Sequence, residues 1–79
     1  MENLVEVASF TFADDAYVLG SILQKENIEY FMSNSIISAV AETRLMVDSK
    51  DVAKTVEIIK EGGFEQYLNN NIIADFLNN

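Results

Sequence analysis

The fold is decided by residues 11–34, TFADDAYVLGSILQKENIEYFMSN. The apolar and small residues in its first half recur at i, i+3, i+4 and i+7: Ala16, Leu19, Gly20 and Leu23. From Ile28 onward the period changes from about 3.6 residues to 2, which is the alternation of a β-strand. The sequence therefore predicts an amphipathic helix that stops at Asn27, followed directly by a strand over residues 28–33.

Both ends of this helix carry residues that suit a helix terminus. Thr11 is a suitable N-cap, and Asp14 and Asp15 place negative charge in the first turn, where the helix dipole favours it. Lys25 places a cation in the last turn. Asn27 is the non-glycine residue that best tolerates the left-handed conformation that ends many helices.

The rest of the chain supplies partners for this helix and strand. Residues 4–10 and 43–47 alternate as strands, and a second helix is expected after a cap at Asp48 or Ser49, ending at Gly62 and Gly63. The first strand and the strand over 28–33 are expected to run parallel, joined by a right-handed crossover. This order predicts an α+β fold, a ferredoxin-like βαββα(β) sandwich with its helices on one face of the sheet.

The phase of the strands predicts which residues that one-sided helix layer leaves uncovered. Val5, Val7, Leu45 and Val47 are expected to face the helices. The opposite face is the candidate interaction face: Leu4, Ala8, Phe10, Phe31, Arg44 and Met46. A face this apolar is usually covered, either by the C-terminal segment, by a second chain or by a ligand.

Arg44 is the cation of this candidate interaction face. It is expected either to form a cross-strand ion pair with Glu6 or Glu29, or to contact a bound anion.

Two segments have a less regular pattern. Residues 34–42 are apolar for a loop and lack a tight-hairpin signature, so a short helical turn that packs Ile36, Ile37 and Val40 is expected there. Residues 1–63 form the predicted ferredoxin-like domain. Residues 64–79 form a C-terminal extension, packed on the same domain or on a partner subunit. We expect a helix over 71–77, whereas 64–68 suits either an edge strand or a helix.

Composition narrows the classes of function. The 79 residues carry 13 acidic and 5 basic side chains, a formal net charge of −8, which argues against nucleic-acid and anionic-membrane partners. No apolar run is long enough to span a membrane, and no signal peptide precedes the first strand, so a cytoplasmic protein is expected. A domain this small buries little core, and it has no cysteine for a disulfide, so we expect a homo-oligomer or a complex with a partner protein.

The residues offer no catalytic machinery. Without histidine or cysteine, the usual nucleophilic triads are absent, and no phosphate-binding glycine loop occurs among three glycines. The acidic pairs Asp14–Asp15 and Asp48/Asp51 are explained by helix capping and the helix dipole. We therefore expect no enzyme activity, no cofactor and no metal site.

Several phrases of the sequence resemble a family of small bacterial domains, the prokaryotic signal-transducing proteins of unknown function. They are LVEVASFT at 4–11, then Ala16, ILQKENI at 22–28 and RLMV at 44–47. Members open with a strand ending in Phe-Thr and end the first helix in a phrase like Leu-Leu-Glu-x-Glu-Gly-Ile, where this chain has Asn27 in place of Gly. The resemblance implies a PII-like fold and a signalling role, with no catalytic residues to carry over.

Two hypotheses of function follow. The first is a non-catalytic bacterial regulatory, signal-transducing or protein-interaction domain that self-associates through the candidate interaction face. The second is a small-molecule sensor of the PII or ACT type, which would bind a metabolite at a sheet edge or between subunits.

Overall fold

The computed structural model describes the backbone of residues 3–37 and 40–78, with side chains outside residues 35–41. The strands are β1 (Leu4–Phe10), β2 (Tyr30–Ile37) and β3 (Val40–Asp48). The α-helices are α1 (Ala13–Lys25), α2 (Val52–Glu61) and α3 (Asn70–Leu77). Short 3₁₀ turns precede α2 and α3: η1 (Ser49–Asp51) and η2 (Glu65–Tyr67).

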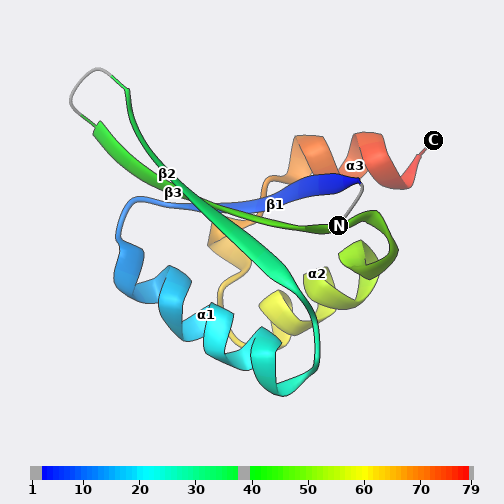
Figure 1. The fold of residues 1–79 in the computed structure, drawn as a ribbon. Helices are drawn as coiled ribbons and strands as arrows, with labels where there is room; N and C mark the ends of the chain where they lie inside the picture. Colours follow the sequence, from blue (N-terminus) through cyan, green and yellow to red (C-terminus); the bar gives the residue numbers. More distant parts are fainter. Residues whose placement is uncertain (1–2, 38–39, 79) are drawn as a thin grey trace.

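The three strands form one sheet in the order β1-β3-β2, with β3 antiparallel to both neighbours. It follows that β1 and β2 run parallel to each other, as predicted, with β3 between them. Helices α1 and α2 lie together on one face of this sheet (Figure 1). The chain is therefore an α+β protein, as the order of its predicted elements indicated.

The unit at 11–34 is a helix and a strand, as predicted, but its ends differ in two respects. Asn27 takes the left-handed conformation with φ of 59°, which ends the helix as expected. The predicted cap at Thr11 is wrong, because the N-cap is Phe12 and no side chain caps the helix there. Strand β2 then begins at Tyr30 instead of Ile28 and continues to Ile37.

The expected helical turn within residues 34–42 is also wrong. Strands β2 and β3 continue through this segment as an antiparallel hairpin, paired from Tyr30↔Val47 as far as Ile37↔Val40. The hairpin projects beyond the helices (Figure 1). Branched aliphatic residues suit a strand as well as a buried turn, and pairing with β3 decides between the two. Residues 38 and 39 of the expected turn lie outside the described part of the chain.

The second helix ends where its local signals place it, but it begins later than predicted. Asp48 caps the 3₁₀ turn η1, whereas the N-cap of α2 is Asp51, which makes no side-chain cap hydrogen bond. The Asp48 carboxylate accepts a hydrogen bond from the Lys50 backbone N–H at 3.1 Å, in the turn that leads into α2. Gly62 is the C-cap, and Gly63 follows with φ of +84°, a backbone conformation that side chains other than glycine rarely adopt.

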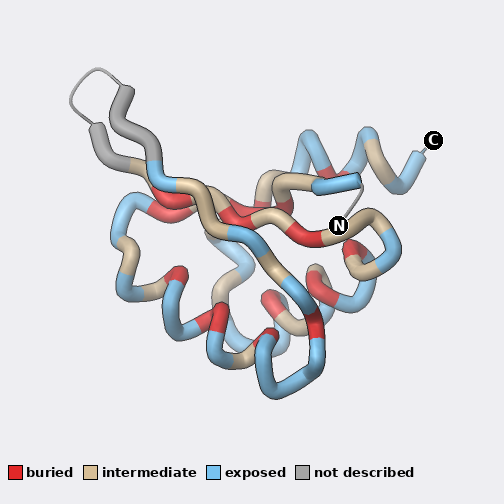
Figure 2. The backbone as a smooth tube through the Cα atoms, in the orientation of Figure 1, coloured by how far each residue is buried: buried red, intermediate tan, exposed pale blue. Residues whose placement is uncertain are grey.

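The core lies between the helices and the sheet (Figure 2). Its largest fully buried side chains are Phe10, Leu19, Leu23, Leu45, Ile59, Val7, Val47, Val52 and Thr55. Gly20 lets α1 approach β2 closely, since a Cβ atom there would lie 2.9 Å from Met32 Cε and from Tyr30 Oη. Met32 and Tyr30 are therefore on the helix side of the sheet.

The C-terminal segment lies along β1. Leu68 forms a single antiparallel bridge with Ala8, and α3 then packs beside the same strand (Figure 1). The predicted C-terminal helix is present, and it begins at Asn70. Residues 64–68, for which the sequence allowed either an edge strand or a helix, instead contain the 3₁₀ turn η2 followed by that one bridge.

Candidate functional site

Four of the six residues of the candidate interaction face lie on the side of the sheet away from α1 and α2. In the register of the sheet, Glu6, Met46 and Phe31 are cross-strand neighbours, and Ser9, Arg44 and Ser33 form the next such row. Phe31 is 53% exposed and Leu4 is 43% exposed, while Met46 and Arg44 are partly exposed. We call this surface the open face: Leu4, Glu6, Ser9, Phe31, Ser33, Arg44 and Met46.

Ala8 and Phe10 do not lie on the open face, which corrects the prediction for both. The register of β1 against β3 shifts between Glu6 and Ala8, at a β-bulge. An extra residue in a strand reverses the alternation of the side chains after it, so Ala8 and Phe10 turn toward the helices. Ala8 is completely buried and Phe10 is 1% exposed.

Phe10 packs in the core against the C-terminal segment. Its ring centroid lies 4.6 Å from that of Tyr67, at a tilt of 37°, and Phe64 stacks beyond Tyr67 at 6.2 Å. The inward turn of Phe10 thus gives η2 its aromatic contact with the body of the protein.

Arg44 forms the cross-strand ion pair that was one of its two predicted roles. Its Nε lies 3.4 Å from Glu6 Oε1, and its Nη2 lies 3.7 Å from Glu42 Oε2. The arginine side chain is 39% exposed, so solvent screens both pairs and each contributes less than about 1 kcal/mol. With two carboxylates already beside it, Arg44 offers an incoming anion a poor site.

Asn69 anchors the C-terminal segment at the β1 edge of the open face. Its Nδ2 donates to Glu6 Oε2 at 2.8 Å, and its Oδ1 accepts from Ser9 Oγ at 3.3 Å. Its backbone N–H donates to the carbonyl of Val7, at the bulge. Sequence reasoning missed this residue, because an asparagine in an asparagine run gives no signal of a distant partner.

α3 leaves the centre of the open face uncovered. The helix packs beside β1 through Ile73, which is 7% exposed, and Phe76, which contacts the edge of the core. Leu4 and Phe31 are 43% and 53% exposed, so the described part of this chain does not cover them.

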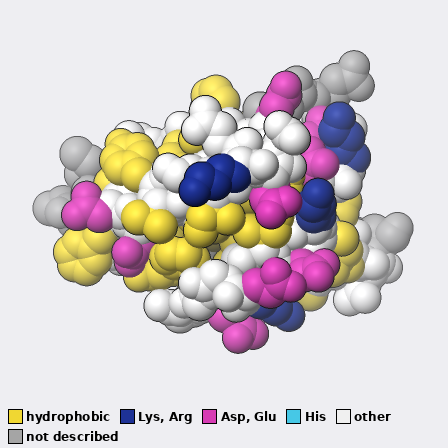
Figure 3. Space-filling view, turned by 90° about the horizontal axis from the view of Figure 1, so that it is seen from below, with side chains coloured by type: hydrophobic (Ala, Val, Ile, Leu, Met, Phe, Trp, Pro, Cys, Tyr) yellow, Lys and Arg dark blue, Asp and Glu magenta, His cyan; other side chains and the backbone are white. Residues whose placement is uncertain are grey.

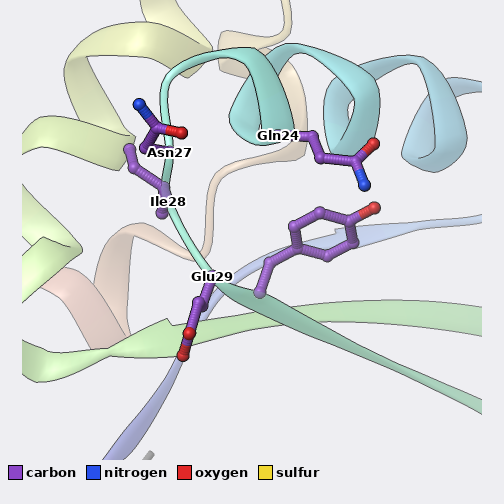
Figure 4. Close-up of a pocket in the computed structure, with 5 residues that line it drawn as sticks. Gln24, Asn27, Ile28 and Glu29 are labelled. Atoms are coloured by element: carbon purple, nitrogen blue, oxygen red, sulfur yellow. The ribbon is translucent and has the colours of Figure 1, made fainter.

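A shallow hollow lies where α1 turns into β2 (Figure 4), lined by Gln24, Asn27, Ile28, Glu29 and Tyr30. Gln24 extends from the last turn of α1, whereas Asn27, Ile28 and Glu29 follow one another along the connection to β2 (Figure 4). Glu29 points away from Gln24 (Figure 4), so the hollow offers a small polar molecule the amide of Gln24 and the phenol of Tyr30. The sequence contains no motif that would have indicated it.

Among residues 3–37 and 40–78, no three acidic side chains lie close enough together to bind a metal ion. In the same described ranges, no helix has the length and apolar character needed to cross a membrane.

Comparisons of the chain with protein-family models, with curated proteins and with solved structures find no match. The class that the fold and the site define is a small α+β domain with a sheet face that its described helices leave exposed.

Proposed function

We propose that this chain is a non-catalytic bacterial regulatory or protein-interaction domain that self-associates through the open face. The observation that carries the proposal is the exposure of Leu4 and Phe31 at 43% and 53%, on a sheet face that neither α1, α2 nor α3 covers. Large apolar side chains exposed on one sheet face of a small domain are typical of a surface that binds another protein.

The charges of the open face favour a second copy as the partner. The net charge of −8 makes two chains repel each other over most of their surfaces. On the open face, Arg44 lies between Glu6 and Glu42, so the local imbalance is small and the apolar side chains of Phe31 and Met46 lie beside it. Two copies can therefore approach here at a low electrostatic cost.

We further propose that the fold is ferredoxin-like, with its fourth strand reduced to one residue. The sheet order β1-β3-β2 is the order of the first three strands in that fold, and Leu68 bridges Ala8 on the outer edge of β1, where a fourth strand would pair. This topology and the resemblance described above support a signal-transducing role of the PII-like kind, which remains a fold-level analogy.

Sedimentation velocity of wild type, Phe31→Glu and Met46→Lys tests the self-association. We expect an oligomeric wild type and a smaller assembly in both variants, because each places a charge within the apolar part of the open face and removes that contact. Phe12→Glu is the matched control, since Phe12 is 72% exposed on another part of the surface. A wild type that sediments as a monomer, with native circular dichroism, contradicts the proposal.

The hollow between α1 and β2 supports a second candidate function, a small-molecule sensor of the PII or ACT type. Its lining runs from Gln24, in the last turn of α1, to Tyr30, the first residue of the edge strand β2, and a sheet edge is one of the places expected for a metabolite site. A thermal-shift panel of amino acids and nucleotides should then contain a compound that raises the Tm of wild type, by mass action. The same compound should have no effect on Gln24→Ala, and a panel without any shift argues against the sensor.

A further inference from the structure

The two edges of the sheet differ in how they are protected. The β1 edge carries a bulge, the bridge from Leu68 and the hydrogen bonds of Asn69, and α3 lies beside it. These features are the usual means by which natural proteins prevent an edge strand from pairing with another chain. The β1 edge is therefore closed to a partner strand.

The β2 edge has none of these features. Strand β2 pairs with β3 over its whole length, Tyr30–Ile37, without a register shift. Within the part of the chain that the structure describes, nothing pairs with its outer edge. Seen from the helix side, hydrophobic side chains gather at one end of the molecule and lie between charged side chains across its middle (Figure 3). Strand β2 contains no charged residue.

The sequence of this edge strand is unusual for an acidic protein. Its residues, YFMSNSII at 30–37, include no charged residue and no proline, although 13 acidic and 5 basic residues occur in the chain. A regular, uncharged edge strand presents free backbone N–H and C=O groups to any strand that can approach.

The same strand has a mirror pattern about Asn34. Residues 31–37 read apolar, apolar, polar, polar, polar, apolar, apolar in either direction. In an antiparallel pair of two copies with the twofold axis at Asn34, position 31 would oppose 37, position 32 would oppose 36 and position 33 would oppose 35. Each pair matches in polarity, and each joins positions on the same face of the sheet, because their separations are even.

We propose that the β2 edge pairs with the β2 edge of a second copy of this chain, in antiparallel register about Asn34. The product is a continuous sheet of six strands, three from each copy, with α1 and α2 of both copies on the same face. This edge is a different interface from the open face. The proposal rests on the proposed function only in the premise that the chain self-associates.

Cysteine cross-linking tests the register, since the chain contains no cysteine of its own. In Asn34→Cys the two Cα atoms would lie about 4.5–5.5 Å apart across the twofold axis, within disulfide reach. In the control Ser33→Cys the two sulfur-bearing residues are diagonal neighbours at about 7–8 Å, beyond that reach. We expect a covalent dimer on mild oxidation of Asn34→Cys alone, and equal cross-linking of both variants, or none, overturns the proposed register.

Sedimentation of charge variants separates this edge from the open face. Asn34→Lys places two like charges on the axis of the edge pair and should abolish edge pairing, whereas Met46→Lys, on the central strand, should leave it intact. Thr43→Val is the control for the 2.8 Å hydrogen bond that Thr43 Oγ1 donates to Asn34 Oδ1, and it should keep the oligomer. If Met46→Lys dissociates the wild-type oligomer and Asn34→Lys does not, the edge proposal fails and the open face stands. A monomeric wild type overturns both.

Discussion

The hydroxyl of Tyr67 donates a hydrogen bond to the carboxylate of Asp15, which ties the 3₁₀ turn η2 to the first turn of α1. The two residues are separated by 52 positions in the sequence, so this contact closes one of the largest loops in the chain. With the ring contact between Phe10 and Tyr67, it fixes the start of the C-terminal segment against the core.

This contact predicts a pH dependence in the alkaline range. The hydrogen bond to Asp15, together with burial and the negative charge of that carboxylate, raises the pKa of Tyr67 above its ordinary value of 10.0. The folded state then holds the phenolic proton more tightly than the unfolded chain does. The resulting stability is present below about pH 10 and is lost as pH rises through the raised pKa.

We therefore expect the midpoint of urea unfolding to fall in wild type as pH rises above about 10, the ordinary tyrosine value, and to fall less in Tyr67→Phe. Tyr17→Phe is the matched control, because Tyr17 is 58% exposed. A pH profile that is the same in wild type and Tyr67→Phe would contradict the assignment.

Thr55 predicts a stabilising substitution. Its hydroxyl is fully buried in α2 and has no hydrogen-bond partner among the described residues. Thr55→Val keeps the shape and removes the unsatisfied hydroxyl, so the free energy of unfolding should rise by about 1 kcal/mol. Thr55→Ser keeps the hydroxyl and removes a methyl group, and it should lower the free energy of unfolding by about 1 kcal/mol. Urea denaturation of both variants measures the difference, and a loss of stability in Thr55→Val would refute the prediction.

Gly20→Ala should change stability only slightly, because two effects oppose each other. Alanine is the better helix former by about 1 kcal/mol, but its Cβ atom would lie 2.9 Å from Tyr30 Oη and from Met32 Cε. Both atoms are the ends of side chains and can shift, so we expect a net change within about 1 kcal/mol in either direction. Ser21→Ala, at an exposed position one residue along α1, should change stability by at most about 0.5 kcal/mol. A loss of about 3 kcal/mol or more in Gly20→Ala, measured by urea denaturation, would show that Tyr30 and Met32 cannot move.

Replacing the amide of Asn69 by a carboxylate should destabilise the folded protein. In Asn69→Asp the group that donates to Glu6 becomes a second acceptor with the same charge, 2.8 Å from the Glu6 carboxylate in the present geometry. The substitution should cost about 1–3 kcal/mol and increase amide exchange in α3, which loses its anchor. Asn71→Asp, at an exposed position of the same helix, is the control. Equal effects of the two substitutions would mean that Asn69 does not hold α3.

The strand phasing predicts opposite outcomes at two phenylalanines. Phe10→Ala should destabilise by about 3–5 kcal/mol, since Phe10 is 1% exposed within the core. Phe31→Ala should cost less than about 1 kcal/mol in the monomer, because Phe31 is 53% exposed. Similar losses at both positions would mean that the bulge in β1 is wrongly placed.

Local chemistry by itself determined the helix–strand unit and the C-terminal ends of α1 and α2. The period of the apolar residues fixed α1, and the left-handed tolerance of Asn27 and Gly63 set where the chain leaves each helix. Alternation also placed Val7, Leu45 and Val47 toward the helices and Phe31 and Met46 away from them. These features depend on neighbours within a few residues, which a sequence displays directly.

Only the tertiary structure decided the bulge in β1, the extended hairpin after Ser33 and the position of the C-terminal segment. A bulge is a property of two strands in register, so nothing in residues 4–10 alone shows that Ala8 and Phe10 turn inward. Asn69 becomes an anchor only because folding brings Glu6 and Ser9 beside it, across 60 positions or more of sequence. Contacts of this kind are selected by packing and hydrogen bonding between distant segments, which local pattern does not encode.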